Sequence, residues 1–299
     1  MRPFARRNRT PIYARDIPRL KGLCLVVSSI LPKHTVRDVE RLRLGPNDVP
    51  ALLVRPETPG RHPAAILQHG YAAEKSALLP FARELAAYGF VVLLADAWGH
   101  GERFPASGPN WMTELTSDYM VDVVRHTVDD VREGLSLLAR RPEVRADQLL
   151  VGGFSLGAIV ALLVGTEDAR TAGVVSIAGS PLPDMLARQH PMVRPPSDEA
   201  RHYIVAHDAA AHVARLAPKP LLISHGRRDD MVPAAGALRL HEQAQPHYAR
   251  RPEALGLRLY DHTHTVTPEQ ALEAVRWIAP FFLDDDTGAA ASGTGDLAS

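Results

Sequence analysis

The chain contains a single cysteine, Cys24, among its 299 residues. One cysteine cannot form an internal disulfide, and it provides no cluster of thiolates for a metal ion. Cys24 lies in a short apolar stretch, distant in sequence from the motifs described below, and we interpret it as a packing residue. We therefore expect neither a disulfide framework nor a cysteine nucleophile.

A net charge of either sign is also lacking, because Lys and Arg total 34 residues and Asp and Glu total 34. A balanced chain has no general electrostatic attraction to nucleic acid or to an anionic membrane surface. We expect no nucleic-acid partner and no membrane partner. The oligomeric state is left open by the sequence.

The N-terminal region lacks an apolar run long enough to span a membrane, and it lacks the cleavage site of a secretory signal. Its apolar run, residues 23–31, is too short to cross a bilayer. A basic stretch precedes this run, as in a secretory signal, but no small-x-small cleavage site follows Leu31. We predict a basic extension over residues 1–35 and a cytoplasmic protein, with export as the alternative.

Patterns that bind phosphate or metal are missing as well. The chain has no Gly-x-x-x-x-Gly-Lys-Ser/Thr run. His202, His207 and His212 recur every five residues, and this step rotates side chains by about 140° around a helix. Such histidines cannot converge on one ion, so we predict no metal and no other cofactor.

The sequence does contain a regular alternation of strands and helices. Two edge strands are expected first, and buried strands then alternate with helices. The predicted strands are 36–44, 49–55, 64–68, 90–95, 148–153, 173–177, 219–224 and 255–260. Helices are expected near 78–88 and 118–141, directly after residue 155, from 234 and from 267. This alternation predicts an α/β fold with a mostly parallel sheet of about eight strands and helices on both faces.

One domain over residues 36–283 accommodates these elements. An insertion at 179–218, rich in proline and histidine, should hold one helix near 198–216 and form a small lid over the strand ends. Residues 284–299 contain mainly Asp, Gly, Ala and Ser, so we predict a disordered tail there.

A predicted buried strand ends in Gly153-Phe154-Ser155-Leu156-Gly157, and an apolar run of helical length follows at once. The pattern is typical of a nucleophile elbow, in which a serine in strained geometry is presented above a sheet. The glycines are expected where a Cβ would collide as the strand folds onto the helix. Ser155 would lie at the helix N-terminus, where amides and the helix dipole favour negative charge. A glycine-rich turn with an unrelated serine is the alternative.

Ligands gather beyond the carboxyl ends of strands in such sheets, so residues after each strand are candidates. The strand at 64–68 runs into His69-Gly70-Tyr71. An acyl-transfer enzyme needs two donors aimed at the oxyanion of the tetrahedral intermediate, and we predict the backbone amides of Tyr71 and Leu156. His69 is a less favoured candidate for the base, because its position fits the oxyanion loop.

Candidates for the acid of a triad are Asp229 and Asp230, which follow the predicted strand at 219–224. A carboxylate there could hold an imidazole in its productive tautomer and stabilise its charged form. We predict Asp229 and keep Asp230 as the alternative. Either aspartate could instead cap a turn or pair with a neighbouring arginine.

Two histidines, His262 and His264, follow the last predicted strand, and we prefer His264 as the base. Most of the 14 histidines must be surface or packing residues, so the argument depends on position rather than on residue type. Ser155, Asp229 and His264 occur in the chain order expected of this architecture.

These segments together resemble the α/β-hydrolase superfamily, over roughly residues 36–283. Within it the chain is similar to dienelactone-hydrolase-like serine esterases and to prolyl-oligopeptidase-like catalytic domains. The resemblance is carried by His69-Gly70-Tyr71, Asp96 to Arg103, Gly153 to Gly157, His225 to Asp229 with Val232-Pro233, and His264. True dienelactone hydrolases use a cysteine nucleophile, whereas this elbow has Ser155, which favours ordinary esters. The resemblance also implies that His264 matches the base better than His262 does.

The loop after the strand at 90–95 has two interpretations. Its charged residues are predicted to brace it through hydrogen bonds and ion pairs; they are Asp96, Glu102 and Arg103. For substrate binding, Trp98 could wall a pocket and His100 could touch the substrate, and we add Trp111 from the irregular segment that follows.

The motifs predict a serine hydrolase that cleaves a small carboxylic ester through an acyl-enzyme intermediate. A serine peptidase or amidase of prolyl-oligopeptidase type would use the same residues, although such enzymes normally restrict access with a propeller domain that the short N-terminal segment cannot form. A non-catalytic binding protein of the same fold is disfavoured by the full set of serine, acid, base and oxyanion loop.

Overall fold

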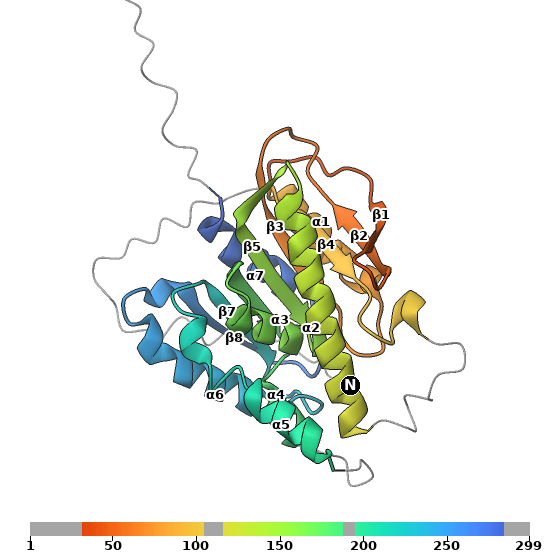
Figure 1. The fold of residues 1–299 in the computed structure, drawn as a ribbon. Helices are drawn as coiled ribbons and strands as arrows, with labels where there is room; N and C mark the ends of the chain where they lie inside the picture. The colour runs from red at the N-terminus through yellow and green to blue at the C-terminus, as the bar shows by residue number, and fades with distance from the viewer. Residues whose placement is uncertain (1–31, 105–115, 188–194, 284–299) are drawn as a thin grey trace, which may run out of the picture. The chain divides into compact units, whose positions relative to one another are not determined.

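The computed structural model describes residues 32–104, 116–187 and 195–283. Cys24, the candidate residue Trp111, nearly all of the predicted basic extension and the predicted tail lie outside these residues. The described strands form one eight-stranded sheet in the order β1-β2-β4-β3-β5-β6-β7-β8 (Figure 1).

The first two strands run antiparallel to their neighbours, and the other six are parallel to one another. The strands are β1 (Glu40–Leu44), β2 (Val49–Val54), β3 (His62–Gln68), β4 (Val91–Ala95), β5 (Val144–Phe154), β6 (Thr171–Ile177), β7 (Leu221–Gly226) and β8 (Leu255–Tyr260). The predicted α/β fold with a mostly parallel sheet of eight strands is confirmed.

Helices cover both faces of this sheet. Figure 1 shows α2 (Ser117–Arg140) and α3 (Leu156–Glu167) in front of it, with α1 (Leu79–Ala87) and α7 (Pro268–Ile278) behind. The other helices are α4 (Leu182–Ala187), α5 (Asp198–Ala206) and α6 (Ala234–Ala244), and short 3₁₀ turns occur at Lys75–Leu78, Gly101–Arg103, Val213–Arg215, Gln245–Tyr248, Pro252–Ala254 and Ala279–Phe281. None of the helices in the described ranges is long and apolar enough to cross a membrane.

The core lies between the sheet and these helices. An apolar stripe along α2 is buried, as its 3- and 4-residue spacing predicts, and consists of Val121, Val124, Val128, Val131, Leu135 and Leu138. Full burial of such a side chain stabilises the fold by about 1.5–3 kcal/mol. On the same helix Gly134 allows close packing, since a Cβ there would lie 2.7 Å from the Cδ1 atom of Ile66.

Strand register brings the carboxyl ends of the central strands to one edge. Gln68 at the end of β3 pairs with Gly153, and Phe154 at the end of β5 pairs with Ile177. Ile177 in turn pairs with Ser224 near the end of β7. The loops that carry the candidate residues therefore leave the sheet at the same edge.

The insertion at 179–218 is more broken than predicted. A single helix over 198–216 is wrong, because α5 ends at Ala206 and only a 3₁₀ turn follows. The Asp208 carboxylate accepts a hydrogen bond from the Ala210 amide at 2.9 Å, a local bond that diverts the backbone from the helix. α5 contacts α2, where Ser197 donates to Asp118. The role of this insertion as a lid stays a prediction.

Candidate active site

Ser155 occupies a sharp turn between β5 and α3. Its backbone has φ 54° and ψ −116°, a left-handed φ that residues other than glycine rarely adopt. The Ser155 amide donates to the Ile177 carbonyl at 2.9 Å, and the Ser155 carbonyl accepts from the amides of Ala158 and Ile159. Sheet and helix hydrogen bonds therefore hold the turn from both sides.

The two glycines that flank this turn are required by close backbone approach. A Cβ on Gly157 would lie 1.9 Å from the carbonyl oxygen of Gln68, and a Cβ on Gly153 would lie 2.3 Å from the carbonyl carbon of Gly157. Backbone atoms cannot move aside as a flexible side chain can. The strand, turn and helix have the geometry predicted for a nucleophile elbow.

His264 lies between Ser155 and Asp229. Its Nε2 atom is 2.9 Å from Ser155 Oγ, and its Nδ1 atom is 2.7 Å from Asp229 Oδ2. An ionised carboxylate only accepts, so Nδ1 carries the proton and Nε2 can accept the proton of the serine hydroxyl. The other Asp229 oxygen, Oδ1, accepts from the amides of Met231 and Val232 at 3.0 and 2.8 Å. The structure thus brings together the three side chains proposed from the sequence.

The alternative acid and base lie outside this arrangement. Asp230 is exposed. His262 has its Nδ1 atom 2.8 Å from the Thr263 carbonyl and its Nε2 atom 3.1 Å from Gln270 Oε1. The Gln270 side chain is therefore directed at His262. The N-terminus of α7 is capped instead by the Thr267 hydroxyl, which accepts a hydrogen bond from the backbone amide of Gln270 at 3.2 Å.

His69 has both ring nitrogens engaged by the backbone. Its Nε2 atom accepts from the Ala97 amide at 2.9 Å, and its Nδ1 atom donates to the Gly70 carbonyl at 2.8 Å. The side chain is buried, and burial lowers the pKa of His69 to about 4. The neutral imidazole, hydrogen-bonded at both nitrogens, links the loop after β3 to the loop after β4. It is not placed to act as a base.

The proposed oxyanion donors come from the residue after the serine and from the loop after β3. Leu156 is the first residue of α3, and Tyr71 lies in the turn that directly follows Gly70. A Cβ on Gly70 would lie 3.4 Å from the Cβ of Ser155. The loop after β3 therefore approaches the serine closely, as a second donor from Tyr71 requires.

Two side chains to which the sequence analysis assigned no role also contact this group. The Phe154 ring lies 5.1 Å from the His264 ring, and its place directly before Ser155 in the elbow could have indicated this. His225 is 0% exposed, with its Nε2 atom 2.7 Å from the Val232 carbonyl and 3.3 Å from Asp229 Oδ2. Burial lowers the pKa of His225, so the ring is a neutral donor near the carboxylate.

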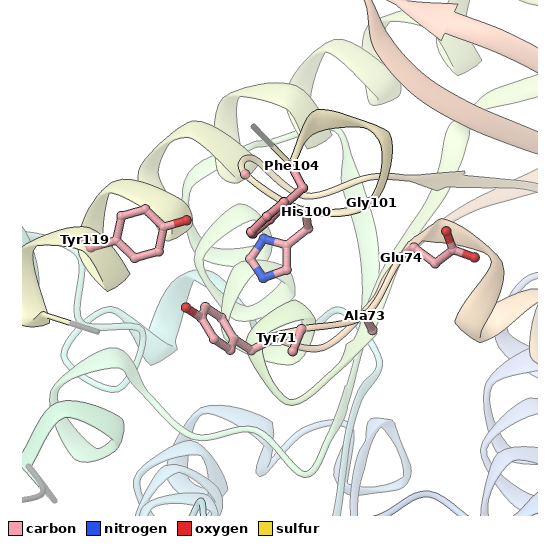
Figure 2. A pocket seen from close by; sticks show the side chains of 9 residues that line it. Tyr71, Ala73, Glu74, His100, Gly101, Phe104 and Tyr119 are labelled. Atoms are coloured by element: carbon pink, nitrogen blue, oxygen red, sulfur yellow. The ribbon is translucent and has the colours of Figure 1, made fainter. Parts of the chain in front are cut away.

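A cavity of about 310 Å³ opens beside the loop after β3 (Figure 2). It is lined by Tyr71, Ala72, Ala73, Glu74, Gly99, His100, Gly101, Phe104 and Tyr119. His100 therefore lines a cavity, and its contact with substrate stays a prediction. Trp98 instead stacks on His126 of α2, with ring centroids 4.9 Å apart, and it is not among the lining residues.

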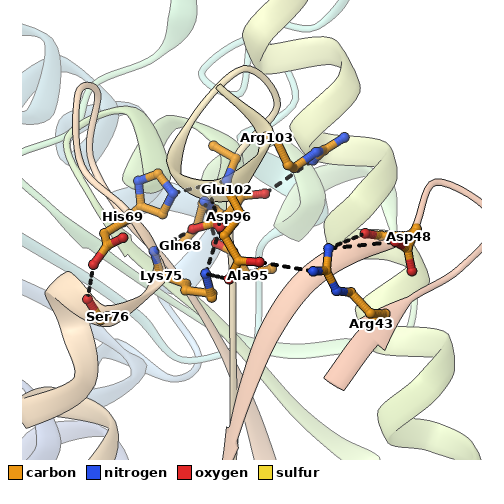
Figure 3. A network of polar contacts seen from close by, with 12 residues as sticks. Arg43, Asp48, Gln68, His69, Lys75, Ser76, Ala95, Asp96, Glu102 and Arg103 are labelled. Atoms are coloured by element: carbon orange, nitrogen blue, oxygen red, sulfur yellow. Dashed lines mark hydrogen bonds and ion pairs between the residues drawn. The ribbon is translucent and has the colours of Figure 1, made fainter. Parts of the chain in front are cut away.

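The loop after β4 is braced by a buried polar network (Figure 3). Asp96, which is 0% exposed, accepts from the Lys75 amide and Nζ at 2.8 Å each and from the Glu102 amide at 3.0 Å. Arg103 donates to the Asp96 carbonyl at 3.1 Å. Glu102 also joins Lys75 Nζ to Arg43 at 2.7 and 2.9 Å. The predicted bracing is confirmed, with Lys75 and Arg43 as partners from distant segments that sequence alone did not indicate.

Metal-binding geometry is not present in the part of the chain that the structure describes. No group of three or more His, Cys, Asp or Glu side chains there is placed to hold an ion.

Strand order, elbow and site geometry define the class of protein. A crystal structure of TT1662 from Thermus thermophilus superposes with a TM-score of 0.70 and 27% identity, covering 83% of this chain and 98% of that one. The acylaminoacyl peptidase of Pyrococcus horikoshii shares the fold at a TM-score of 0.60 and 12% identity, over 85% of this chain and 42% of that one. The chain belongs to the α/β-hydrolase superfamily.

Sequence comparisons point in the same direction. A family model described as serine aminopeptidase, S33 matches residues 61–194. Esterase YjfP of Escherichia coli (strain K12) is 28% identical over 207 residues, which cover 65% of this chain and 80% of the relative. The chain is therefore a distant homologue of esterases and other hydrolases of this fold.

Proposed function

We propose that this chain is a serine hydrolase that cleaves carboxylic esters of small molecules through an acyl-enzyme intermediate. The observation that carries the proposal is the pair of contacts from Ser155 Oγ through His264 to Asp229, at 2.9 and 2.7 Å. Both distances are within hydrogen-bond reach, as proton transfer from a serine nucleophile requires. Homology to esterases supports the same chemistry.

In the first step Ser155 Oγ attacks the ester carbonyl carbon while its proton moves to His264 Nε2. The Asp229 carboxylate stabilises the imidazolium that forms. Asp229 is held by two backbone amides, so it does not have to reorganise during the reaction. His264 then returns the proton to the departing alcohol, and the acyl group remains on Ser155.

The tetrahedral intermediate carries a negative charge on the former carbonyl oxygen. We assign its stabilisation to the backbone amides of Tyr71 and Leu156, with a contribution from the N-terminus of α3. One such donor is typically worth about 3 kcal/mol of barrier lowering. In the second step His264 activates a water molecule that hydrolyses the acyl-enzyme and releases the acid.

Amide hydrolysis is the second candidate, because the matching family model is described as a serine aminopeptidase. The same three side chains would perform it. Rates for an aminoacyl p-nitrophenyl ester and the matched p-nitroanilide separate the two functions. We expect measurable hydrolysis of the ester and little of the anilide.

Replacement of the serine tests the whole assignment. Ser155→Ala should reduce hydrolysis of p-nitrophenyl acetate to background without changing the far-UV circular dichroism. A fluorophosphonate should label the wild-type chain on the peptide that contains Ser155, and the variant should not be labelled. Ser136→Ala removes a half-buried hydroxyl of α2 that contacts Arg132 and Arg170; it is the matched control and should keep wild-type turnover. Unchanged turnover in Ser155→Ala would reject the proposal.

A further inference from the structure

The cavity beside the proposed oxyanion loop has a defined set of polar groups. Its walls come from the loop after β3, the loop after β4 and the first turn of α2. Tyr71, one of its lining residues, directly follows Gly70. Gly70 in turn approaches Ser155 closely. A substrate with its carbonyl at Ser155 could therefore extend into it. Its volume, about 310 Å³, lies at the small end of the usual range for ligand pockets.

His100 presents a hydrogen-bond acceptor to this cavity. Its Nδ1 atom is 2.8 Å from the Trp98 carbonyl oxygen. A carbonyl only accepts, so Nδ1 carries the proton and the lone pair is on Nε2. Burial lowers the pKa of His100, which keeps the ring neutral near pH 7.

Two phenol hydroxyls share the same space. Figure 2 shows the hydroxyl groups of Tyr71 and Tyr119 pointing toward the region that the His100 ring faces. Burial, with Tyr119 nearby, raises the pKa of Tyr71 to about 12, and burial also raises the pKa of Tyr119. Both hydroxyls therefore stay protonated and can donate or accept.

The position of the Tyr119 hydroxyl depends on a glycine in the opposite wall. Gly99 has φ +70°, and a Cβ there would lie 2.8 Å from the Tyr119 oxygen. Any larger residue at this position would displace the hydroxyl. Among the lining residues that the structure describes, Glu74 is the one carboxylate and none is a lysine or arginine. These residues therefore offer mainly neutral hydrogen-bonding groups and no cation for an anion.

The strand order decides which half of an ester lies here. Asp229 and His264 follow β7 and β8, on one side of β5, whereas the cavity loops follow β3 and β4 on the other side. The departing alcohol must take its proton from His264, so it lies toward β7 and β8. The acyl group then extends toward β3 and β4, into the cavity.

We propose that this cavity is an acyl site that selects esters of short hydroxy acids, with the substrate hydroxyl donating to His100 Nε2 and contacting the hydroxyls of Tyr71 and Tyr119. The inference rests on the proposed esterase function and adds the class of acid. An acyl chain with a free carboxylate is disfavoured, because Glu74 would repel it and the described lining residues include no lysine or arginine to pair with it.

Matched esters and matched variants test this site. The p-nitrophenyl esters of 3-hydroxypropionic, propionic and succinic acid should be ranked in that order by kcat/KM. One neutral hydrogen bond is worth about a 3- to 10-fold preference for the hydroxy ester over propionate. His100→Asn can still donate to the Trp98 carbonyl but lacks Nε2, and Tyr119→Phe lacks only the hydroxyl. Each should lower the hydroxy-to-plain ratio by about 3- to 10-fold. Tyr203→Phe, on α5, is the control and should leave the ratio unchanged.

The possible outcomes separate this inference from the function on which it rests. Hydrolysis of both esters with equal efficiency, or an unchanged ratio in His100→Asn and Tyr119→Phe, would overturn the acyl site and leave the esterase function intact. A preference for 2-hydroxyethyl acetate over ethyl acetate that these variants abolish would place the hydroxyl on the alcohol side and overturn the acyl assignment. No hydrolysis of any ester would overturn the esterase function and the acyl site with it.

Discussion

The Nε2 atom of His264 lies 2.9 Å from Ser155 Oγ although 109 positions separate the two residues in the chain. The contact depends on a glycine at the end of β7. A Cβ on Gly226 would lie 2.5 Å from the His262 carbonyl oxygen and 2.6 Å from that of Thr263. The histidine loop therefore folds directly over the end of β7, and this close passage carries His264 back toward β5.

Replacement of the two histidines of this loop should give unequal results. His264→Ala removes the atom next to the serine and should lower kcat for p-nitrophenyl acetate by about 10²- to 10⁴-fold, the usual contribution of a general base. His262→Ala removes a ring bonded to Thr263 and Gln270 and should leave kcat within a few-fold of wild type. Steady-state kinetics near pH 8 checks both. Equal losses would contradict the assignment of the base.

The elbow and the triad residues could be proposed from sequence because their signals are local. The elbow is marked by glycines two residues on either side of Ser155, where the backbone geometry permits few other residues. The acid and base are marked by their positions directly after buried strands, where the sites of such sheets lie. The strand and helix positions followed from periodicity for the same reason. To predict that the triad residues meet in space, only a parallel sheet had to be assumed.

The features that sequence did not reveal depend on contacts between distant segments. Lys75 lies within an ordinary polar stretch, and nothing in that stretch indicates its ion pair with Asp96. Tyr119 enters the cavity only because Gly99, from another loop, leaves room for its hydroxyl. The insertion was predicted to hold one helix over 198–216, but α5 ends at Ala206, and a hydrogen bond from the Ala210 amide to the Asp208 side chain holds the following residues off the helical path.

The buried pair of Asp96 and Lys75 should contribute strongly to stability. Their side chains are 0% and 8% exposed, and the two charged atoms are 2.8 Å apart. Burial on its own would lower the pKa of Lys75, but hydrogen bonds to Asp96 and Glu102 raise it overall, so the ammonium form is held. Asp96→Asn leaves that charge without its main partner and should cost about 3–5 kcal/mol.

Urea denaturation followed by tryptophan fluorescence measures this loss. Glu253→Gln removes one partner of an exposed pair with Arg251 and is the control, with an expected cost below about 1 kcal/mol. Similar costs for the two variants would show that the network around Asp96 is not a stabilising brace.

Stability should also depend on pH through His69. Burial lowers its pKa from 6.5 to about 4 in the folded chain, so between these pH values the unfolded chain binds the proton more readily. The contribution of neutral His69 is therefore complete above pH 6.5 and is lost as the pH falls toward 4. A shift of this size corresponds to about 3 kcal/mol.

Denaturation midpoints measured at several pH values in this window provide the check. His69→Asn has no titrating ring, so its free energy of unfolding should fall less steeply with decreasing pH than that of wild type, whatever its absolute stability. His202→Asn replaces an exposed histidine of α5 and should keep the wild-type slope. A wild-type slope in His69→Asn would show that His69 is not held neutral.

His225 should act on the proposed triad by positioning its acid. The Nε2 atom is 2.7 Å from the Val232 carbonyl, which can only accept, so it carries a proton. The same N–H is 3.3 Å from Asp229 Oδ2, the oxygen that also accepts from His264. The positive end of this N–H dipole beside that oxygen stabilises the carboxylate and weakens its hold on a protonated His264.

His225→Leu removes this donor, so Asp229 should stabilise the protonated base more strongly. The acid limb of the kcat/KM profile should then move to higher pH, by up to about one unit, since a net hydrogen bond is worth about 1 kcal/mol. His225→Gln can still donate from its amide and should reverse most of the shift. A purely structural role would lower kcat or the melting temperature in both variants and leave the position of the acid limb unchanged. The pH profile therefore separates an effect on the carboxylate from a loss of packing beneath it.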